Sequence, residues 1–119
     1  MKGAINRRFV YETRVVVPNP RFHLDQLCRS LSELGAETGG KGADRILDFE
    51  IGRALIRIES CAILARVEAQ DLVACHSIKV AIEGNIAAIR GLAQSSVLWV
   101  AACEVPFVGL TGCCGVTED

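Results

Sequence analysis

The sequence predicts an α+β domain with the element order β-α-β-β-β-α-β, in which two helices pack on one face of an antiparallel sheet. Residues 43–68 read as three consecutive strands joined by short turns. A helix pattern with one apolar stripe flanks this region on each side along the chain. Hairpin-linked strands between two helices favour an α+β layer over a parallel, doubly wound sheet. With no long linker, residues 1–119 are predicted to form a single domain.

The first strand is predicted at residues 8–17 and ends before Pro18. Successive side chains of a strand point to opposite faces of the sheet. One face carries Phe9, Tyr11, Thr13, Val15 and Val17, and the other carries Arg8, Val10, Glu12, Arg14 and Val16. The basic and acidic side chains of this strand are therefore expected to share one face.

The first helix is predicted to begin at Asn19-Pro20, with Asn as N-cap and Pro at the first helical position. Its apolar stripe consists of Leu24, Leu27, Cys28, Leu31 and Leu34. Gly35 is the expected C-cap. Residues 37–42, which contain three glycines, are predicted to form a flexible loop.

The central sheet follows with a short strand at residues 46–49 and a turn at Gly52. Residues 52–59 and 61–68 then alternate between apolar and charged side chains. Glu59-Ser60 separates these two runs and indicates a tight hairpin. One face of the sheet is thus predicted to be apolar and covered by the helices, and the other to be mostly charged.

The second helix is predicted at residues 69–92, with its apolar face formed by Leu72, Cys75, Ile78, Ile82, Ile86 and Ile89. Lys79 and Glu83 are spaced as an i,i+4 pair. The interior Gly84 costs about 1 kcal/mol relative to Ala and is a candidate for close packing. A last strand is predicted at residues 97–105, and the glycine-rich tail 107–119 is expected to be irregular.

Composition argues against several classes of function. Thirteen basic and fourteen acidic residues give a net charge of −1, so no electrostatic case exists for nucleic acid or for an anionic membrane. The first twenty residues show no apolar signal region, and no run of residues reaches the length of a membrane helix. The sequence therefore predicts a cytoplasmic protein whose six cysteines are reduced thiols.

The chain resembles an uncharacterised bacterial family, known as domain of unknown function 2218, over about residues 14–99. The resemblance is carried by RVVVPNPRFHLDQLCRSL, RILDFEIGRALIRIES, LARVEAQD and the tryptophan of SSVLWV. It implies a small cytoplasmic α+β domain without an assigned activity. Members of the family sometimes occur beside siderophore-interacting flavoproteins, which implies a link to iron metabolism. Two histidines typical of the family are replaced here by Ser30 and Asn85, so no ligand role of those histidines is transferred.

The candidate site is the charged face of the sheet, where arginines surround apolar side chains. Its residues are Arg14, Arg53, Leu55, Arg57, Leu64 and Arg66. Leu55 and Leu64 are expected to be cross-strand neighbours. The face is either a solvated surface laced with ion pairs or an interface that a second subunit or a small anionic ligand covers. We favour the interface, and with it a non-enzymatic homodimer that requires no cofactor.

Cysteine chemistry offers an alternative of another class. Cys113 and Cys114 are candidates for binding a soft metal or for redox chemistry, although adjacent cysteines do not have the spacing of a zinc site. An enzyme that acts on a small anion held by Arg53 and Arg57 ranks last. The sequence contains no identifiable nucleophile, general base or phosphate-binding loop for such a reaction.

Overall fold

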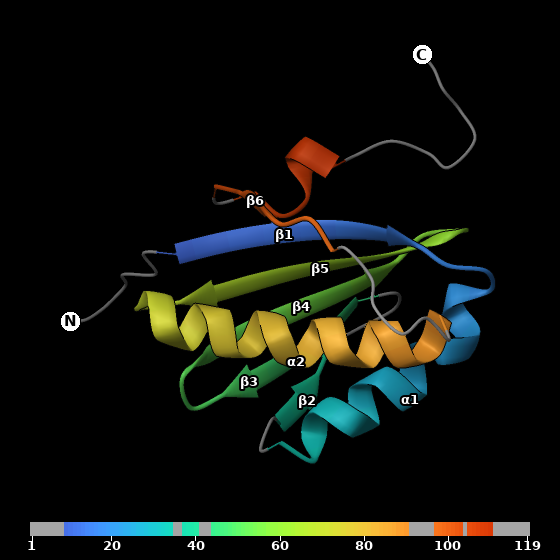
Figure 1. The fold of residues 1–119 in the computed structure, drawn as a ribbon, viewed down its shortest axis with the longest axis horizontal. Helices are drawn as coiled ribbons and strands as arrows, with labels where there is room; N and C mark the ends of the chain where they lie inside the picture. The colour runs from blue at the N-terminus through green and yellow to red at the C-terminus, as the bar shows by residue number, and fades with distance from the viewer. Residues whose placement is uncertain (1–8, 35–36, 41–43, 91–96, 104, 111–119) are drawn as a thin grey trace.

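The fold is α+β, as the sequence predicts. The computed structural model describes residues 9–34, 37–40, 44–90, 97–103 and 105–110. The elements are β1 (Phe9–Val16), α1 (Pro20–Ser32), β2 (Glu37–Gly39), β3 (Asp44–Phe49), β4 (Gly52–Ile58), β5 (Ala62–Ala69), α2 (Leu72–Arg90), β6 (Val100–Ala101) and the 3₁₀ helix η1 (Val108–Leu110). Their arrangement is shown in Figure 1.

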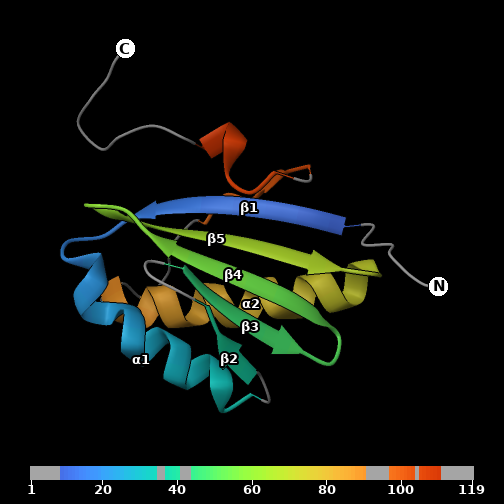
Figure 2. The ribbon, with the colours of Figure 1, turned by 180° about the vertical axis from the view of Figure 1, so that it is seen from behind.

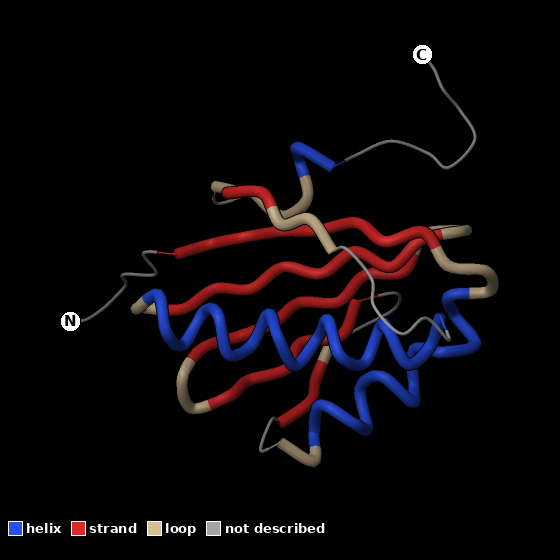
Figure 3. The backbone as a smooth tube through the Cα atoms, viewed as in Figure 1, coloured by secondary structure: helices blue, strands red, loops and turns tan. Residues whose placement is uncertain are grey.

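Six strands form one antiparallel sheet in the order β2-β3-β4-β5-β1-β6. Both α1 and α2 lie on the same side of this sheet, and they contact each other as well as the strands behind them (Figure 3). None of the helices in the described ranges is long and apolar enough to cross a membrane.

Three elements differ from the sequence-based expectation. β2 lies inside the predicted loop 37–42, where Thr38 pairs with Leu47 at the edge of the sheet. β6 has only two residues of the predicted nine. Before it, the carbonyl of Leu98 accepts a hydrogen bond of 2.6 Å from the hydroxyl of Thr13, and after it the amide of Ala102 donates to the carbonyl of Val10 at 2.9 Å. Part of the tail that was expected to be irregular forms η1.

The core lies between the helices and the inner face of the sheet. Leu24, Leu27, Cys28 and Leu31 of α1 and Cys75, Ile78, Ile82 and Ile86 of α2 are buried there, as predicted. The predictions for Leu34 and Leu72 were wrong, since these side chains are 59% and 55% exposed. Leu34 lies beyond the end of α1, and Leu72 is the first residue of α2, so neither faces the sheet. The side chain of Ile89 lies outside the described residues.

The helix starts also differ in detail from the prediction. Asn19 is the N-cap residue of α1 and Pro20 follows it, but Asn19 has a left-handed backbone (φ 50°) and makes no side-chain capping hydrogen bond. The second helix starts three residues later than predicted. Its start is capped by Asp71, whose carboxylate accepts a hydrogen bond of 2.7 Å from the amide of Ala74.

Candidate functional site on the outer face of the sheet

The candidate site lies on the outer face of the sheet, which is the face turned away from α1 and α2 (Figure 2). Strand pairing places all six predicted site residues on this outer face, because each outward residue of one strand pairs with an outward residue of the neighbouring strand. The register differs from the expectation in one respect. Leu55 pairs with Arg66, and Leu64 pairs with Arg57, so the two leucines are diagonal neighbours.

Three successive cross-strand pairs of β3 and β4 point outward, and we call each pair a rung. Together they form what we call the three-rung patch. Its rungs are Asp44–Arg57, Ile46–Leu55 and Asp48–Arg53. An apolar pair therefore lies between two Asp–Arg pairs. Ile46 and Leu55 are both only partly buried, so the centre of the patch retains apolar surface in contact with solvent.

Both outer rungs of the three-rung patch are ion pairs. Arg57 donates to the two carboxylate oxygens of Asp44 at 2.8 and 3.0 Å, a bidentate arrangement. Hydrogen bonding by Arg57 lowers the pKa of Asp44, and the same hydrogen bond raises the pKa of Arg57. Arg53 donates to Asp48 at 2.8 Å in a pair that is half exposed to solvent.

Arg66 lies at the centre of the outer face between two carboxylates. Its Nη1 donates to Glu12 at 2.6 Å and its Nε donates to Glu68 at 2.7 Å. The side chains of Arg66 and Glu12 are only 4% and 2% exposed. Burial acts to lower the pKa of Arg66, but the hydrogen bonds to Glu68 and Glu12 outweigh it, so the pKa lies above its ordinary value.

Arg14 lies at the end of the face where β4 turns into β5. Its Nε donates to Glu59 at 2.9 Å, and both side chains are partly exposed. The Nη2 atom of Arg14 is buried and has no hydrogen-bond partner among the described residues. The predicted arginines thus all lie next to carboxylates on this face.

The centre of the outer face is covered by a segment that the sequence did not place there. Residues 105–110, which we call the strap, lie along β1 in both ribbon views (Figures 1 and 2). The side chain of Phe107 is 1% exposed, and its ring centroid lies 5.0 Å from the guanidinium carbon of Arg57. The amide of Phe107 donates to Glu12 at 2.7 Å.

The outer face is therefore not open to solvent at its centre. Leu64 is 2% exposed and Arg66 is 3% exposed, so neither offers a surface while the strap is in place. Sequence reasoning missed Phe107 because it belongs to a glycine-rich stretch without periodicity. The one available signal was an aromatic residue directly after Pro106, in a chain with only 5% aromatic residues.

A small cavity separates the strap from the three-rung patch. Its volume is about 170 Å³, and it is lined by Ile46, Arg53, Leu55, Arg66, Glu68 and Pro106. The cavity shows that Pro106 projects over the apolar rung of the patch without filling the space above it. The strap and the patch are thus neighbours on one surface.

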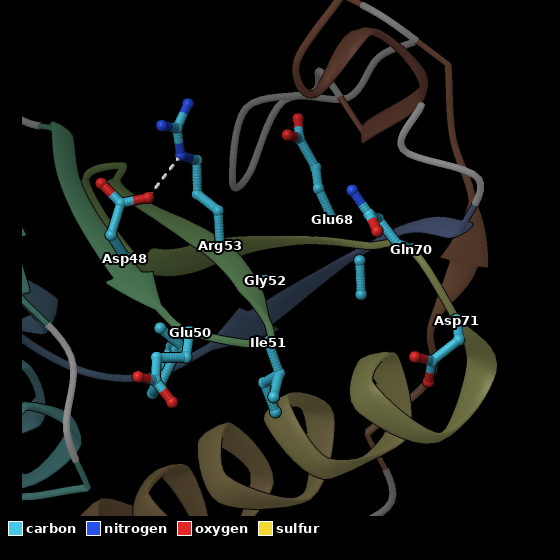
Figure 4. A pocket seen from close by; sticks show the side chains of 10 residues that line it. Asp48, Glu50, Ile51, Gly52, Arg53, Glu68, Gln70 and Asp71 are labelled. Atoms are coloured by element: carbon cyan, nitrogen blue, oxygen red, sulfur yellow. Dashed lines mark hydrogen bonds and ion pairs between the residues drawn. The ribbon is translucent and has the colours of Figure 1, made fainter. Parts of the chain in front are cut away.

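A larger hollow of about 550 Å³ lies at the other end of the sheet, between the β3–β4 turn and the start of α2. Asp48, Glu50, Glu68 and Asp71 contribute carboxylates to its lining. Figure 4 shows that these carboxylates point away from one another, and Asp71 is engaged as a helix cap. Within the described part of the chain, no three His, Cys, Asp or Glu side chains are grouped so that they could hold a metal ion.

The cysteines fall into two groups in the structure. Cys28, Cys75 and Cys103 are free thiols, and burial raises the pKa of Cys28 and of Cys75, which makes both poor nucleophiles. Cys61 is disulfide-bonded, so the expectation of six reduced thiols was wrong at this position. Cys113 and Cys114 lie outside the described residues, and their proposed metal or redox role stays a prediction.

The fold and site together define a small α+β domain with a charge-balanced outer sheet face. The chain is similar in fold to PA4090 from Pseudomonas aeruginosa, whose NMR structure superposes with a TM-score of 0.67 at 11% sequence identity. The match covers 78% of this chain and 96% of that one. No family model and no curated protein matches the chain, so the resemblance to domain of unknown function 2218 stays a prediction.

Proposed function

We propose that the chain is a non-enzymatic binding module that forms a homodimer through the three-rung patch on its outer sheet face. The observation that carries the proposal is the pattern of the patch, in which an apolar rung lies between two Asp–Arg rungs. The partly exposed Ile46 and Leu55 provide apolar area to bury, and the charges around them set the orientation of a partner.

The pattern suits a second copy of the same chain. Consider a two-fold axis that lies in the interface and runs along the strands, midway between β3 and β4. Rotation about this axis places β3 of one copy over β4 of the other, in register. Each aspartate then faces an arginine, and the apolar rung faces itself, as an isologous interface requires.

Other partners match this surface less well. A nucleic acid requires unbalanced positive charge, whereas Arg53 and Arg57 are already paired with aspartates at 2.8 Å. A small anionic ligand would have to displace one of these carboxylates. We therefore consider it a less suitable partner than a second copy of the chain. A cytoplasmic location is part of the proposal: the free thiols at Cys28, Cys75 and Cys103 support it, and the disulfide at Cys61 counts against it.

Sedimentation equilibrium of the purified chain from about 1 to 500 µM tests the dimer, since weak complexes dissociate in this range. Leu55→Asp introduces a charge at the centre of the apolar rung and is expected to produce a monomer. Val73→Asp is a matched control, because Val73 is 77% exposed in the first turn of α2, where an acidic residue is tolerated. A chain that stays monomeric throughout this range, both as the wild type and after Phe107→Ala loosens the strap, contradicts the proposal.

A further inference from the structure

We propose that the strap, residues 105–110, is an internal cover that competes with the second copy for the outer face. Dimerisation then requires the strap to leave its position over the sheet. This inference rests on the proposed dimer and adds its regulation. It is carried by the position of the strap on the same surface as the three-rung patch.

The strap occupies space that a docked copy needs. Phe107 contacts Arg57, which forms one rung of the patch, and Pro106 lines the cavity above Ile46 and Leu55. Two sheets that pack face to face lie about 10 Å apart, which leaves room only for their interdigitating side chains. A backbone segment in that layer therefore excludes the second sheet from this part of the patch.

Of the strap's described side chains, that of Phe107 is the one that is buried. Phe107 supplies its buried ring and the amide hydrogen bond to Glu12. The side chains of Val105 and Val108 are 61% and 55% exposed and add little burial. Phe107 also has a positive φ of 63°, a conformation that is unfavourable for a bulky side chain.

Opening of the strap has a compensating effect at the site beneath it. The Arg66–Glu12 pair, buried under Phe107, regains water when the strap leaves, which offsets part of the lost packing. The apparent dissociation constant of a complex equals its intrinsic value divided by the fraction of competent molecules. Because both copies must open, the apparent constant of the dimer depends on the square of the open fraction.

The test is sedimentation equilibrium of four full-length chains: wild type, Phe107→Ala, Val108→Ala and the double variant Phe107→Ala/Leu55→Asp. We expect Phe107→Ala to lower the apparent dimer dissociation constant at least about tenfold, because it removes the anchor of the strap. Val108→Ala should match the wild type, since this side chain is already exposed. The double variant should be monomeric, which would show that the enhanced association uses the three-rung patch.

The outcomes separate the inference from the proposed function. If Leu55→Asp dissociates the dimer but Phe107→Ala leaves its dissociation constant unchanged or higher, the dimer stands and the strap inference is overturned. If neither the wild type nor Phe107→Ala associates, both are overturned. Circular dichroism verifies folding of each variant. Should Phe107→Ala unfold, Pro106→Gly loosens the strap while it retains the ring, and it is expected to change the constant in the same direction.

Discussion

The guanidinium of Arg66 lies 2.6 Å from the carboxylate of Glu12 on the sheet face turned away from α1 and α2. Residues Arg66 and Glu12 are direct partners across β1 and β5, and the strap seals them from solvent. A buried ion pair is costly to desolvate, so it is stable only where further hydrogen bonds satisfy its atoms. Here Glu68 and the amide of Phe107 provide those hydrogen bonds, and the pair links the sheet to the strap.

Glu12→Ala is predicted to destabilise the protein by about 3–5 kcal/mol, because it removes a buried carboxylate that bonds to Arg66 at 2.6 Å. The amide of Phe107 also loses its acceptor. Urea denaturation at neutral pH measures the change. Glu50→Ala is the control at an exposed turn and should lie within about 0.5 kcal/mol of the wild type. A loss below about 1 kcal/mol for Glu12→Ala would show that the pair is solvated and that the strap does not seal it.

Two glycines are predicted to respond oppositely to alanine. A Cβ atom at Gly52 would lie 2.5 Å from the carbonyl oxygen of Glu68 and 2.9 Å from Cδ1 of Ile78, so Gly52→Ala forces β4 away from its neighbours. We expect a loss of about 1–3 kcal/mol. A Cβ atom at Gly84 meets nothing within 4 Å, and Gly84→Ala should stabilise α2 by about 1 kcal/mol.

Thermal unfolding of both variants against the wild type checks this pair of predictions. Stabilisation by Gly52→Ala would mean that β4 and α2 are not in close contact at this position. The result also bears on sequence reasoning, because Gly84 was the predicted site of close packing and the structure shows open space there. The turn glycine, Gly52, is the position that packs closely.

The alternation of side chains with a period of two residues in β4 and β5 accounts for most of what the sequence could predict. In residues 52–58 every second side chain is buried, so this alternation alone tells which side chains face inward and which face outward. β5 is different, since its outward Leu64 and Arg66 are buried as well. That burial depends on the strap, whose contacts with β1 join residues nearly a hundred positions apart. No local pattern in the sequence encodes such a contact.

The sequence alone also did not predict which carboxylates pair with the arginines. Asp44 and Asp48 are each the ion-pair partner of an arginine on β4. The alternation along a strand tells on which face a side chain lies. The register between two strands depends on the conformation of the turn that joins them. The sequence therefore predicted which residues share the outer face. Which of them pair across the strands is known only from the structure.

The Asp44–Arg57 pair predicts a pH dependence of stability. The pKa of Asp44 is lowered below its ordinary value of 3.8 in the folded protein, so folding favours the ionised carboxylate. Its contribution is fully present above about pH 5 and is lost as the pH falls through the folded pKa. Because the pair is about one-third exposed, the contribution is at most about 1 kcal/mol.

Asp44→Asn should therefore lower the free energy of unfolding at pH 7, and the difference from wild type should vanish near about pH 2, where the carboxyl is protonated in both states. Guanidinium denaturation at the two pH values checks this. Asp25→Asn is the control, because Asp25 is exposed on α1 and makes none of the ion pairs found among the described residues. A difference that stays constant with pH would assign the effect of Asp44→Asn to packing instead of charge.

The contact between α2 and the segment before β6 provides a spectroscopic prediction. Trp99 donates from Nε1 to the carboxylate of Glu83 at 2.6 Å, and the ammonium of Lys79 lies 4.0 Å from the centroid of Tyr11. The predicted i,i+4 pair of Lys79 and Glu83 is thus replaced by contacts of each residue with an aromatic ring. Since Trp99 is the one tryptophan in the chain, tryptophan fluorescence reports on the surroundings of this one ring.

Glu83→Ala removes the acceptor of the indole and is expected to cost about 1–2 kcal/mol, because a hydrogen bond to a charged group is lost in a partly buried setting. The emission of Trp99 should shift to longer wavelength in the folded state, as the segment before β6 gains access to water. Glu83→Gln retains an acceptor at the same position and should keep most of the stability and the emission of the wild type. Equal losses for Ala and Gln would mean that the charge of Glu83 is required, whereas no change in either variant would show that Trp99 does not bond to α2 in solution.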